Sequence, residues 1–192
     1  GQKELRDFIK AFAVANDITF VIATHSPFLV NSDELNELRV VRMKDNKAEI
    51  INLFSAVDVD DPDSLLPIKD ALTIKQNILY DYDTRVVWVE GITDYNYLTL
   101  FKKLLGYQNI SFLPFKGVGK EDMQDVIIQK LASIKFPNVE ILVDADKAGL
   151  AFKQKCQNTK FKDRVISIDQ VSSNAKYKEI ENLFSVTDRQ KY

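Results

Sequence analysis

Residues 85–106, RVVWVEGITDYNYLTLFKKLLG, decide the fold that we expect for this chain. The first part, RVVWVEG, is a nearly continuous run of β-branched and aromatic side chains, which is typical of a strand buried on both faces. The second part, TDYNYLTLFKKLLG, predicts a helix that ends at Gly106, because glycine commonly closes a helix. This stretch therefore predicts a strand followed directly by a helix.

The same alternation of strand and helix continues to the end of the chain. The further expected strands are ISFLPFKG (110–117), NVEILVDAD (138–146) and RVISIDQV (164–171). The further expected helices are GKEDMQDVIIQKLASI (119–134) and KAGLAFKQKCQNTKF (147–161). Alternating elements with short links predict an α/β fold with a parallel sheet, right-handed crossovers and helices on both faces.

Residues 1–54 read as the closing part of a separate mixed α/β unit. KELRDFIKAFAVAN (3–16) has apolar residues at helical spacing, and ITFVIAT (18–24) has the continuous apolar character of a buried strand. LRVVRM (38–43) and AEIINLF (48–54) predict two strands around the polar turn at 44–47.

Residues 55–84 differ from both neighbouring units and predict an acidic linker followed by a helix. VDVDDPDS (57–64) is a loop by its charge and by Pro62. It lacks the glycine and the final glutamate of an EF-hand, so we do not interpret it as a calcium loop. SLLPIKDALTIKQNILYDYD (64–83) is expected to be helical and to link the two units.

The net charge of −2 conceals an uneven distribution along the chain. Residues 1–84 hold 9 Lys or Arg and 15 Asp or Glu, whereas residues 85–192 hold 17 and 13. The basic second part suits a nucleic-acid partner, although a solvated surface with surplus lysine explains the charge equally simply.

The cysteine count and the hydropathy pattern exclude several classes of protein. A single Cys excludes an internal disulfide and a multi-cysteine zinc site, and it fits a reducing, cytoplasmic setting. No apolar run approaches the roughly 20 residues that a membrane-spanning helix needs, so we expect no membrane partner.

Four carboxylates stand where a parallel sheet forms its ligand sites, at the carboxyl ends of strands. Glu90 follows the first strand, Asp94 lies just inside the next helix, and Asp144 and Asp146 close the third strand. Clustered carboxylates are costly without a cation, and ligands that are all oxygen suit Mg²⁺, Mn²⁺ or Ca²⁺. The alternative is that Asp94 and Asp146 cap helices and that Glu90 is a surface charge.

The glycine pair in FKGVGKED is expected to form a turn near these carboxylates. A phosphate-binding P-loop would need glycine where Pro114 stands and Ser or Thr where Glu121 stands, so this is not one. Gly117 and Gly119 instead predict a tight turn at the end of the second strand.

These motifs together resemble the Toprim (topoisomerase–primase) fold, a Rossmann-like parallel sheet, over residues 85–192. The resemblance rests on VEGITD around Glu90, GVG around Gly117 and DADKAG around Asp144, in that order. In addition, ITFVIATHSPFLV resembles the C-terminal portion of an ABC-type ATPase head, in which a strand leads into a histidine switch. The resemblance implies that His25 contacts a nucleotide γ-phosphate or the attacking water.

An ABC-type tail followed by a Toprim domain resembles the OLD (overcoming lysogenization defect) family of ATP-dependent DNA nucleases, which includes anti-phage defence proteins. The resemblance implies an endonuclease that uses Mg²⁺ or Mn²⁺, with Ca²⁺ as a stand-in, and that acts on DNA as a homo-oligomer of the full-length parent. Its metal ligands would be the four carboxylates and Glu181, in the late motif EIENLF, and its catalytic residues would be Glu90, Asp144, Asp146 and Lys176 or Lys178. The residue after Glu181 is Asn182, where such motifs commonly carry a second acid.

The chain has no Walker A, ABC signature or Walker B motif. We therefore interpret it as a C-terminal fragment of a longer protein and expect ATP to be bound and hydrolysed in the full-length parent only. In that parent, His25→Ala should reduce ATP turnover.

Two other functions are compatible with a Toprim-like domain. A primase of the bacterial type usually adds a cysteine-rich zinc module, which Cys156 alone cannot form, and a topoisomerase needs a separate domain that presents a nucleophilic tyrosine. A docking module with a decayed metal site is the non-catalytic alternative, and the intact set of four carboxylates argues against it.

Overall fold

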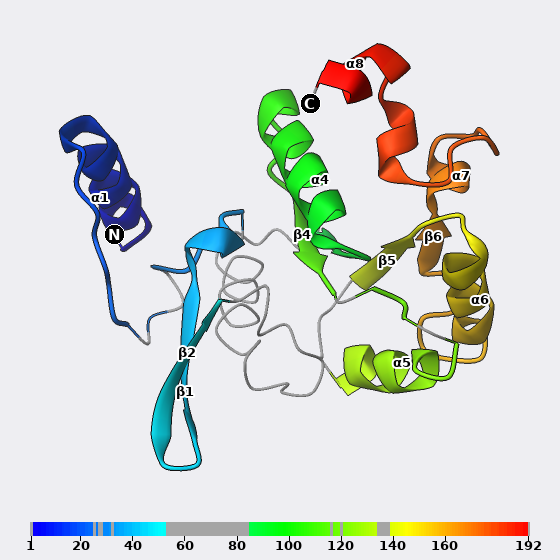
Figure 1. Cartoon of the computed structure of the whole chain (residues 1–192), viewed down its shortest axis with the longest axis horizontal. Coiled ribbons are helices and arrows are strands. Elements are labelled where there is room, and N and C mark those ends of the chain that lie inside the picture. The colour runs from blue at the N-terminus through cyan, green and yellow to red at the C-terminus, as the bar shows by residue number, and fades with distance from the viewer. Residues whose placement is uncertain are drawn as a thin grey trace.

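The computed structural model describes residues 2–24, 26, 29–31, 33–52, 85–115, 117–119, 121–133 and 139–191. Its centre is a four-stranded sheet with the strand order β4-β3-β5-β6, in which every pairing is parallel (Figure 1). The strands are β3 (Arg85–Val89), β4 (Ile110–Pro114), β5 (Val139–Val143) and β6 (Val165–Ser167). The prediction of a parallel α/β sheet in this part of the chain is therefore confirmed.

Helices cover both faces of this sheet. The three crossover helices are α4 (Ile92–Leu105), α5 (Gln124–Ser133) and α6 (Lys147–Cys156). The chain moves from β3 to β4 through α4, and then back across the sheet to β5 and β6 through α5 and α6. Because the two directions are opposite and crossovers are right-handed, α4 lies on one face of the sheet and α5 and α6 lie on the other. Figure 1 shows this arrangement, with α4 on one side of the strands and α5 and α6 on the other.

The core lies between the sheet and these helices. Strand β3 is its centre, because the four residues after Arg85 are all buried and Trp88 is 1% exposed. Phe152 of α6 is fully buried, and its ring lies 6.1 Å from that of Phe115, which follows β4. The nearly continuous apolar character of β3 is thus explained by helices packing on both of its faces.

Some of the predicted element boundaries are confirmed and others are not. Gly106 closes helix α4, as expected, and its φ of 73° is the left-handed conformation that favours glycine. The expected strand at 164–171 was too long, because it ends at Ser167, which is the N-cap of the short helix α7 (Ile168–Val171) and donates its amide hydrogen to Oε1 of Gln170 at 3.3 Å. The expected helix at 147–161 ends at Cys156. In the described residues no helix is both long and apolar enough to cross a membrane.

The N-terminal part contains helix α1 (Gln2–Asn16), the 3-10 turn η2 (Leu35–Glu37) and the hairpin of β1 (Arg39–Lys44) and β2 (Lys47–Asn52). The strands of the hairpin are antiparallel, with Lys44 opposite Lys47. Asp45 and Asn46 between them have φ values of 50° and 60°, the left-handed pair that a two-residue hairpin turn requires. The helix and the hairpin were both predicted, and both are confirmed.

The predicted buried strand at 18–24 was wrong. These residues form no strand and are exposed; the side chain of Val21 is 94% exposed. A β-branched run indicates a suitable side-chain pattern, but a strand also needs a neighbour for its backbone hydrogen bonds. None of the strands in the described residues pairs with this segment, although the rings of Phe12 and Phe20 lie 6.4 Å apart.

The segment before the hairpin docks on α4. Leu35 is fully buried, and its backbone amide donates a hydrogen bond to the Tyr95 hydroxyl at 3.2 Å. The ammonium group of Lys102, which is buried, lies 2.7 Å from both carboxylate oxygens of Asp33. Helix α4 therefore connects the N-terminal part of the chain to the sheet.

The C-terminal segment passes over the same helix. It contains the 3-10 turn η4 (Ile180–Leu183) and the short helix α8 (Val186–Lys191). The ring of Phe184 lies 4.8 Å from that of Tyr97 and 5.9 Å from that of Phe101, both on α4. These aromatic contacts hold the C-terminal segment against the helix that begins beside Glu90.

Candidate acidic site at the ends of strands β3 and β5

The carboxylates predicted from the sequence follow two strands that are neighbours in the sheet. Strands β3 and β5 pair directly, with Val89 opposite Leu142, although β4 separates them along the chain. The helix after β3 leads to β4 on one side, and the helix after β5 leads to β6 on the other. This is the point where the strand order reverses, at which open α/β sheets form their ligand sites.

Glu90 is fixed at this point by the backbone on both sides. Its Oε1 accepts a hydrogen bond from the amide of Val118, and its Oε2 accepts one from the amide of Asp144, each at 3.3 Å. Burial raises the pKa of the Glu90 carboxyl, these two hydrogen bonds oppose the increase, and the charge of Asp146 adds to it. Glu90 therefore links the turn after β4 to the end of β5.

The turn after β4 is formed by the two glycines, as predicted. Gly117 and Gly119 have φ values of 69° and 61°, which side chains with a Cβ rarely adopt. The amide of Gly117 donates to the carbonyl of Glu90 at 2.8 Å. The turn thus lies directly against the first carboxylate of the site.

Asp144 is half-buried beside several other acids. Burial raises the pKa of its carboxyl to about 7, and the charges of Glu90, Asp94, Glu179 and Asp146 contribute to the increase in that order. Burial is the first cause of the increase, and the neighbouring negative charges add to it because they disfavour ionisation.

Asp94 and Asp146 each cap a helix as well as contributing charge to the site. The Oδ2 of Asp94 accepts from the amide of Gly91 at 2.9 Å, and the Oδ1 of Asp146 accepts from the amide of Gly149 at 2.7 Å. Burial raises the pKa of Asp94 to about 6, with the charges of Glu181 and Glu90 adding to the effect. The capping alternative is therefore correct for both residues, and it leaves each of them a second carboxylate oxygen.

The C-terminal segment brings two more acids to the site. Ile180 is 1% exposed, and Glu179 and Glu181 flank it. The charge of Glu181 acts on Asp94 and that of Glu179 acts on Asp144. Glu181 was predicted, whereas Glu179 was missed; its signal in the sequence is the acid–apolar–acid pattern EIE.

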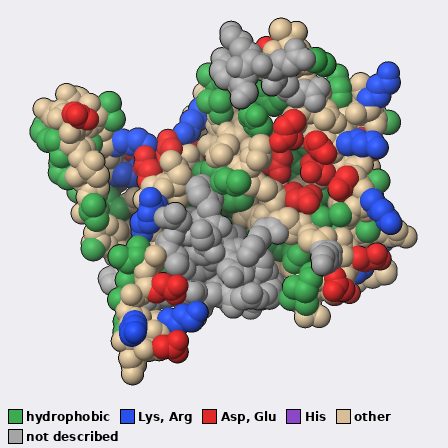
Figure 2. Space-filling model, viewed as in Figure 1, with side chains coloured by type: hydrophobic (Ala, Val, Ile, Leu, Met, Phe, Trp, Pro, Cys, Tyr) green, Lys and Arg blue, Asp and Glu red, His purple; other side chains and the backbone are tan. Residues whose placement is uncertain are grey.

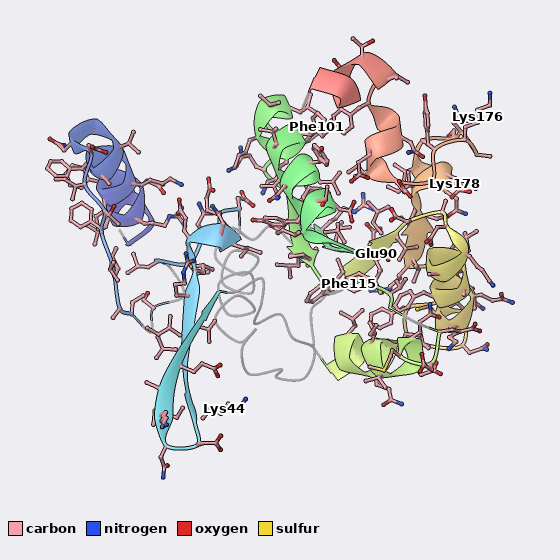
Figure 3. The ribbon with its side chains drawn as sticks, viewed as in Figure 1. Lys44, Glu90, Phe101, Phe115, Lys176 and Lys178 are labelled. Atoms are coloured by element: carbon pink, nitrogen blue, oxygen red, sulfur yellow. The ribbon has the colours of Figure 1, made fainter. Side chains whose placement is uncertain are left out.

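The two candidate lysines differ in how the backbone holds them. The carbonyl of Lys178 accepts a hydrogen bond from the amide of Ala145 at 2.7 Å, so this residue is tied to the loop between Asp144 and Asp146. The amide of Lys176 donates to the Oδ1 of Asn174 at 3.1 Å, within its own turn. Figure 3 shows both lysines on the side of the site that the C-terminal segment forms.

The surface around the site carries charge of both signs. Figure 2 shows a group of Asp and Glu side chains on the face between α4 and the C-terminal segment, with Lys and Arg side chains along one border. An acidic centre with a basic border is the distribution expected of a cation site that meets a polyanion.

The donor set fits a hard divalent cation, but the side chains do not form a closed shell. In the described residues, no three His, Cys, Asp or Glu side chains come together as a group that could hold an ion. Carboxylate oxygens of Glu90, Asp94 and Asp146 accept hydrogen bonds from backbone amides. The oxygen-only chemistry and the raised pKa values of Asp94 and Asp144 are nevertheless those of a site whose charge a cation would neutralise.

Two features predicted from the sequence lie in parts of the chain that the structure does not describe. They are His25 and the whole of the acidic linker at 55–84. Comparison of the sequence with models of known protein families gave no match, and comparison with curated proteins gave none either. The assignment of a function therefore depends on the acidic site itself.

Proposed function

We propose that residues 85–192 form a divalent-metal-dependent DNA endonuclease domain of the Toprim type. The observation that carries this proposal is the gathering of Glu90, Asp94, Asp144 and Asp146 at the point where the strand order reverses. Burial, and then the charges of its neighbours, raise the pKa of Asp144 to about 7 and so destabilise its carboxylate. A cation bound among these carboxylates would therefore stabilise the folded protein.

Carboxylate oxygens of Glu90, Asp94 and Asp144 would hold Mg²⁺ or Mn²⁺, with Asp146 and Glu181 as further ligands. Such an ion, when bound, supplies charge neutralisation on a phosphodiester and lowers the pKa of bound water. Glu90 has one orientation because two backbone amides hold it. That fixed orientation suits a ligand or a base that must act at one defined place.

Lys178 is the better of the two lysine candidates. Its backbone is tied to Ala145, between Asp144 and Asp146, whereas the described backbone contact of Lys176 is within its own turn. An ammonium group in that position would stabilise the negative charge that builds on the phosphate during cleavage. Lys176 then belongs to the basic border that meets the DNA backbone.

The wider proposal is that this chain belongs to an OLD-type ATPase–nuclease that acts against phage or other foreign DNA. It is supported by the order of the VEGITD, GVG and DADKAG motifs and by THSP near the N-terminus. In the full-length parent, ATP and His25 would belong to the ATPase part, and DNA would be the partner of the acidic site.

A nicking assay on supercoiled plasmid tests the proposed function. The chain is incubated with Mg²⁺, Mn²⁺, Ca²⁺ or EDTA and compared with Asp144→Asn under each condition. Nicking with Mg²⁺ or Mn²⁺ that is lost with EDTA and in the variant supports the proposal. Absence of nicking by both the chain and the full-length parent refutes it, and metal-independent DNA binding without cleavage would favour a docking module.

A further inference from the structure

The peptide that carries Lys178 is held at both ends by hydrogen bonds. Its carbonyl accepts from the amide of Ala145 at 2.7 Å, and its amide donates to the side-chain Oδ1 of Asn182 at 2.9 Å. The first bond joins it to the loop after β5 and the second to the turn η4. Lys178 is therefore the point at which the C-terminal segment meets the strand loop of the acidic site.

Asn182 holds more than this one peptide. The same Oδ1 also accepts from the amide of Glu179 at 3.4 Å, and the amide of Asn182 donates to the carbonyl of Glu179 at 3.0 Å. One side chain thus fixes the backbone of two consecutive residues. Those residues are the preferred lysine and the acid whose charge acts on Asp144.

The segment around Asn182 is anchored independently of these bonds. Ile180 is buried, and Phe184 packs on Tyr97 and Phe101 of α4. These apolar contacts keep the segment on the domain when the Asn182 side chain is changed. A loss of the amide oxygen should therefore alter the orientation of residues 178 and 179 without unfolding the domain.

We propose that Asn182 is a positioning residue of the acidic site, which holds Lys178 and Glu179 toward the loop between Asp144 and Asp146. This inference rests on the proposed function. Asn182 acts through the two residues that it orients.

The experiment compares three variants. Asn182→Ala removes the acceptor oxygen, Asn182→Asp keeps it, and Asn174→Ala is the matched control, because Asn174 makes the same kind of bond to the amide of Lys176. Each protein is measured for thermal unfolding, for Mn²⁺ affinity by calorimetry, for kcat and KM of plasmid nicking, and for hydrogen exchange of residues 144–147 and 178–182.

Asn182→Ala should lower Mn²⁺ affinity and kcat by about 3–10-fold, the equivalent of one lost hydrogen bond, with KM unchanged. It should also speed hydrogen exchange at Ala145 and Glu179, while Asn182→Asp restores both kcat and slow exchange. The control should resemble the unchanged protein in every measurement.

Equal Mn²⁺ affinity, kcat and exchange in Asn182→Ala and the unchanged protein would overturn the inference and leave the proposed function intact. Failure of Asn182→Asp to restore slow exchange would also overturn it, since the acceptor would then be irrelevant. If the unchanged protein binds no Mn²⁺ and nicks no plasmid, the proposed function fails, and the inference fails with it.

Discussion

The Oε2 of Glu90 lies 3.3 Å from the backbone nitrogen of Asp144 and accepts its hydrogen bond. This contact joins the carboxyl ends of two strands that are adjacent in space, although α4, β4 and α5 separate them along the chain. It places the first predicted carboxylate against the third predicted motif.

Glu90→Gln should abolish nicking while preserving DNA binding. The amide is nearly isosteric, but it removes the negative charge and sets an NH₂ group against one of the two backbone amides that the carboxylate now accepts from. We expect nicking to fall at least about 100-fold, as for loss of a key charged group in an active site. Gel-shift affinity for the same DNA should stay within about two-fold, because phosphate contacts dominate affinity. Full nicking by this variant would remove Glu90 from the site.

Lys178→Ala should lower kcat far more than Lys176→Ala does. Of the two lysines, Lys178 is the one whose backbone carbonyl is bound to Ala145, beside the acidic site. Loss of its ammonium group should therefore lower kcat by about 10–100-fold. Lys176→Ala should instead weaken DNA binding modestly and reduce its salt dependence. Nicking kinetics and gel shifts over a salt series separate the two roles. Equal effects of the two substitutions would contradict the assignment.

The contribution of Asp144 to the stability of the metal-free protein should become more unfavourable as the pH rises from about 4 to about 7. In the folded state the pKa of Asp144 is about 7, above its ordinary value of 3.8, so the folded state binds more protons over this range. Asp144→Asn should therefore stabilise the protein at pH 8 by about 1–2 kcal/mol, allowing for solvent screening, and much less at pH 4. Urea unfolding at both values measures this. A benefit that is the same at both pH values would contradict the raised pKa.

Gly149→Ala should disrupt the site by a steric clash. A Cβ at this position would lie 2.1 Å from the carbonyl oxygen of Asp144, so helix α6 or the strand loop must shift. We expect a loss of stability of about 2–3 kcal/mol, typical of overpacking a buried position. The control is Gly106→Ala, where a Cβ meets nothing within 4 Å and only the positive φ is unfavourable. It should cost about 1 kcal/mol. Equal unfolding free energies for the two variants would show that α6 tolerates the extra carbon.

Asp33→Asn should destabilise the protein more than removal of a surface ion pair does. It leaves the ammonium of Lys102, whose side chain is 4% exposed, without its carboxylate partner. The expected cost is about 2–3 kcal/mol, and Lys102→Met in the same protein should recover much of it. Glu140→Gln is the control, because its partner Arg85 is 56% exposed and the pair should contribute less than about 1 kcal/mol. Chemical unfolding of the four proteins gives the comparison.

The sequence alone determined the parallel sheet, because the apolar runs at 85–89, 110–114 and 139–143 are typical of strands and alternate with helical segments. It also determined the turn at Gly117 and the acids at the strand ends, since both depend on residue type and local spacing. It failed at 18–24, where the residue pattern of a strand occurs without a pairing strand in the described residues.

Only the tertiary structure decided which of these residues meet. Strand order is not encoded in local pattern, so the adjacency of β3 and β5, and with it the bond from Asp144 to Glu90, could not be inferred from spacing. The approach of Glu179 to Asp144 and the tie between Lys178 and Ala145 likewise depend on how a distant C-terminal segment packs. Residue type and period are local properties of a chain, whereas contacts between remote segments are fixed by the packing of the whole domain.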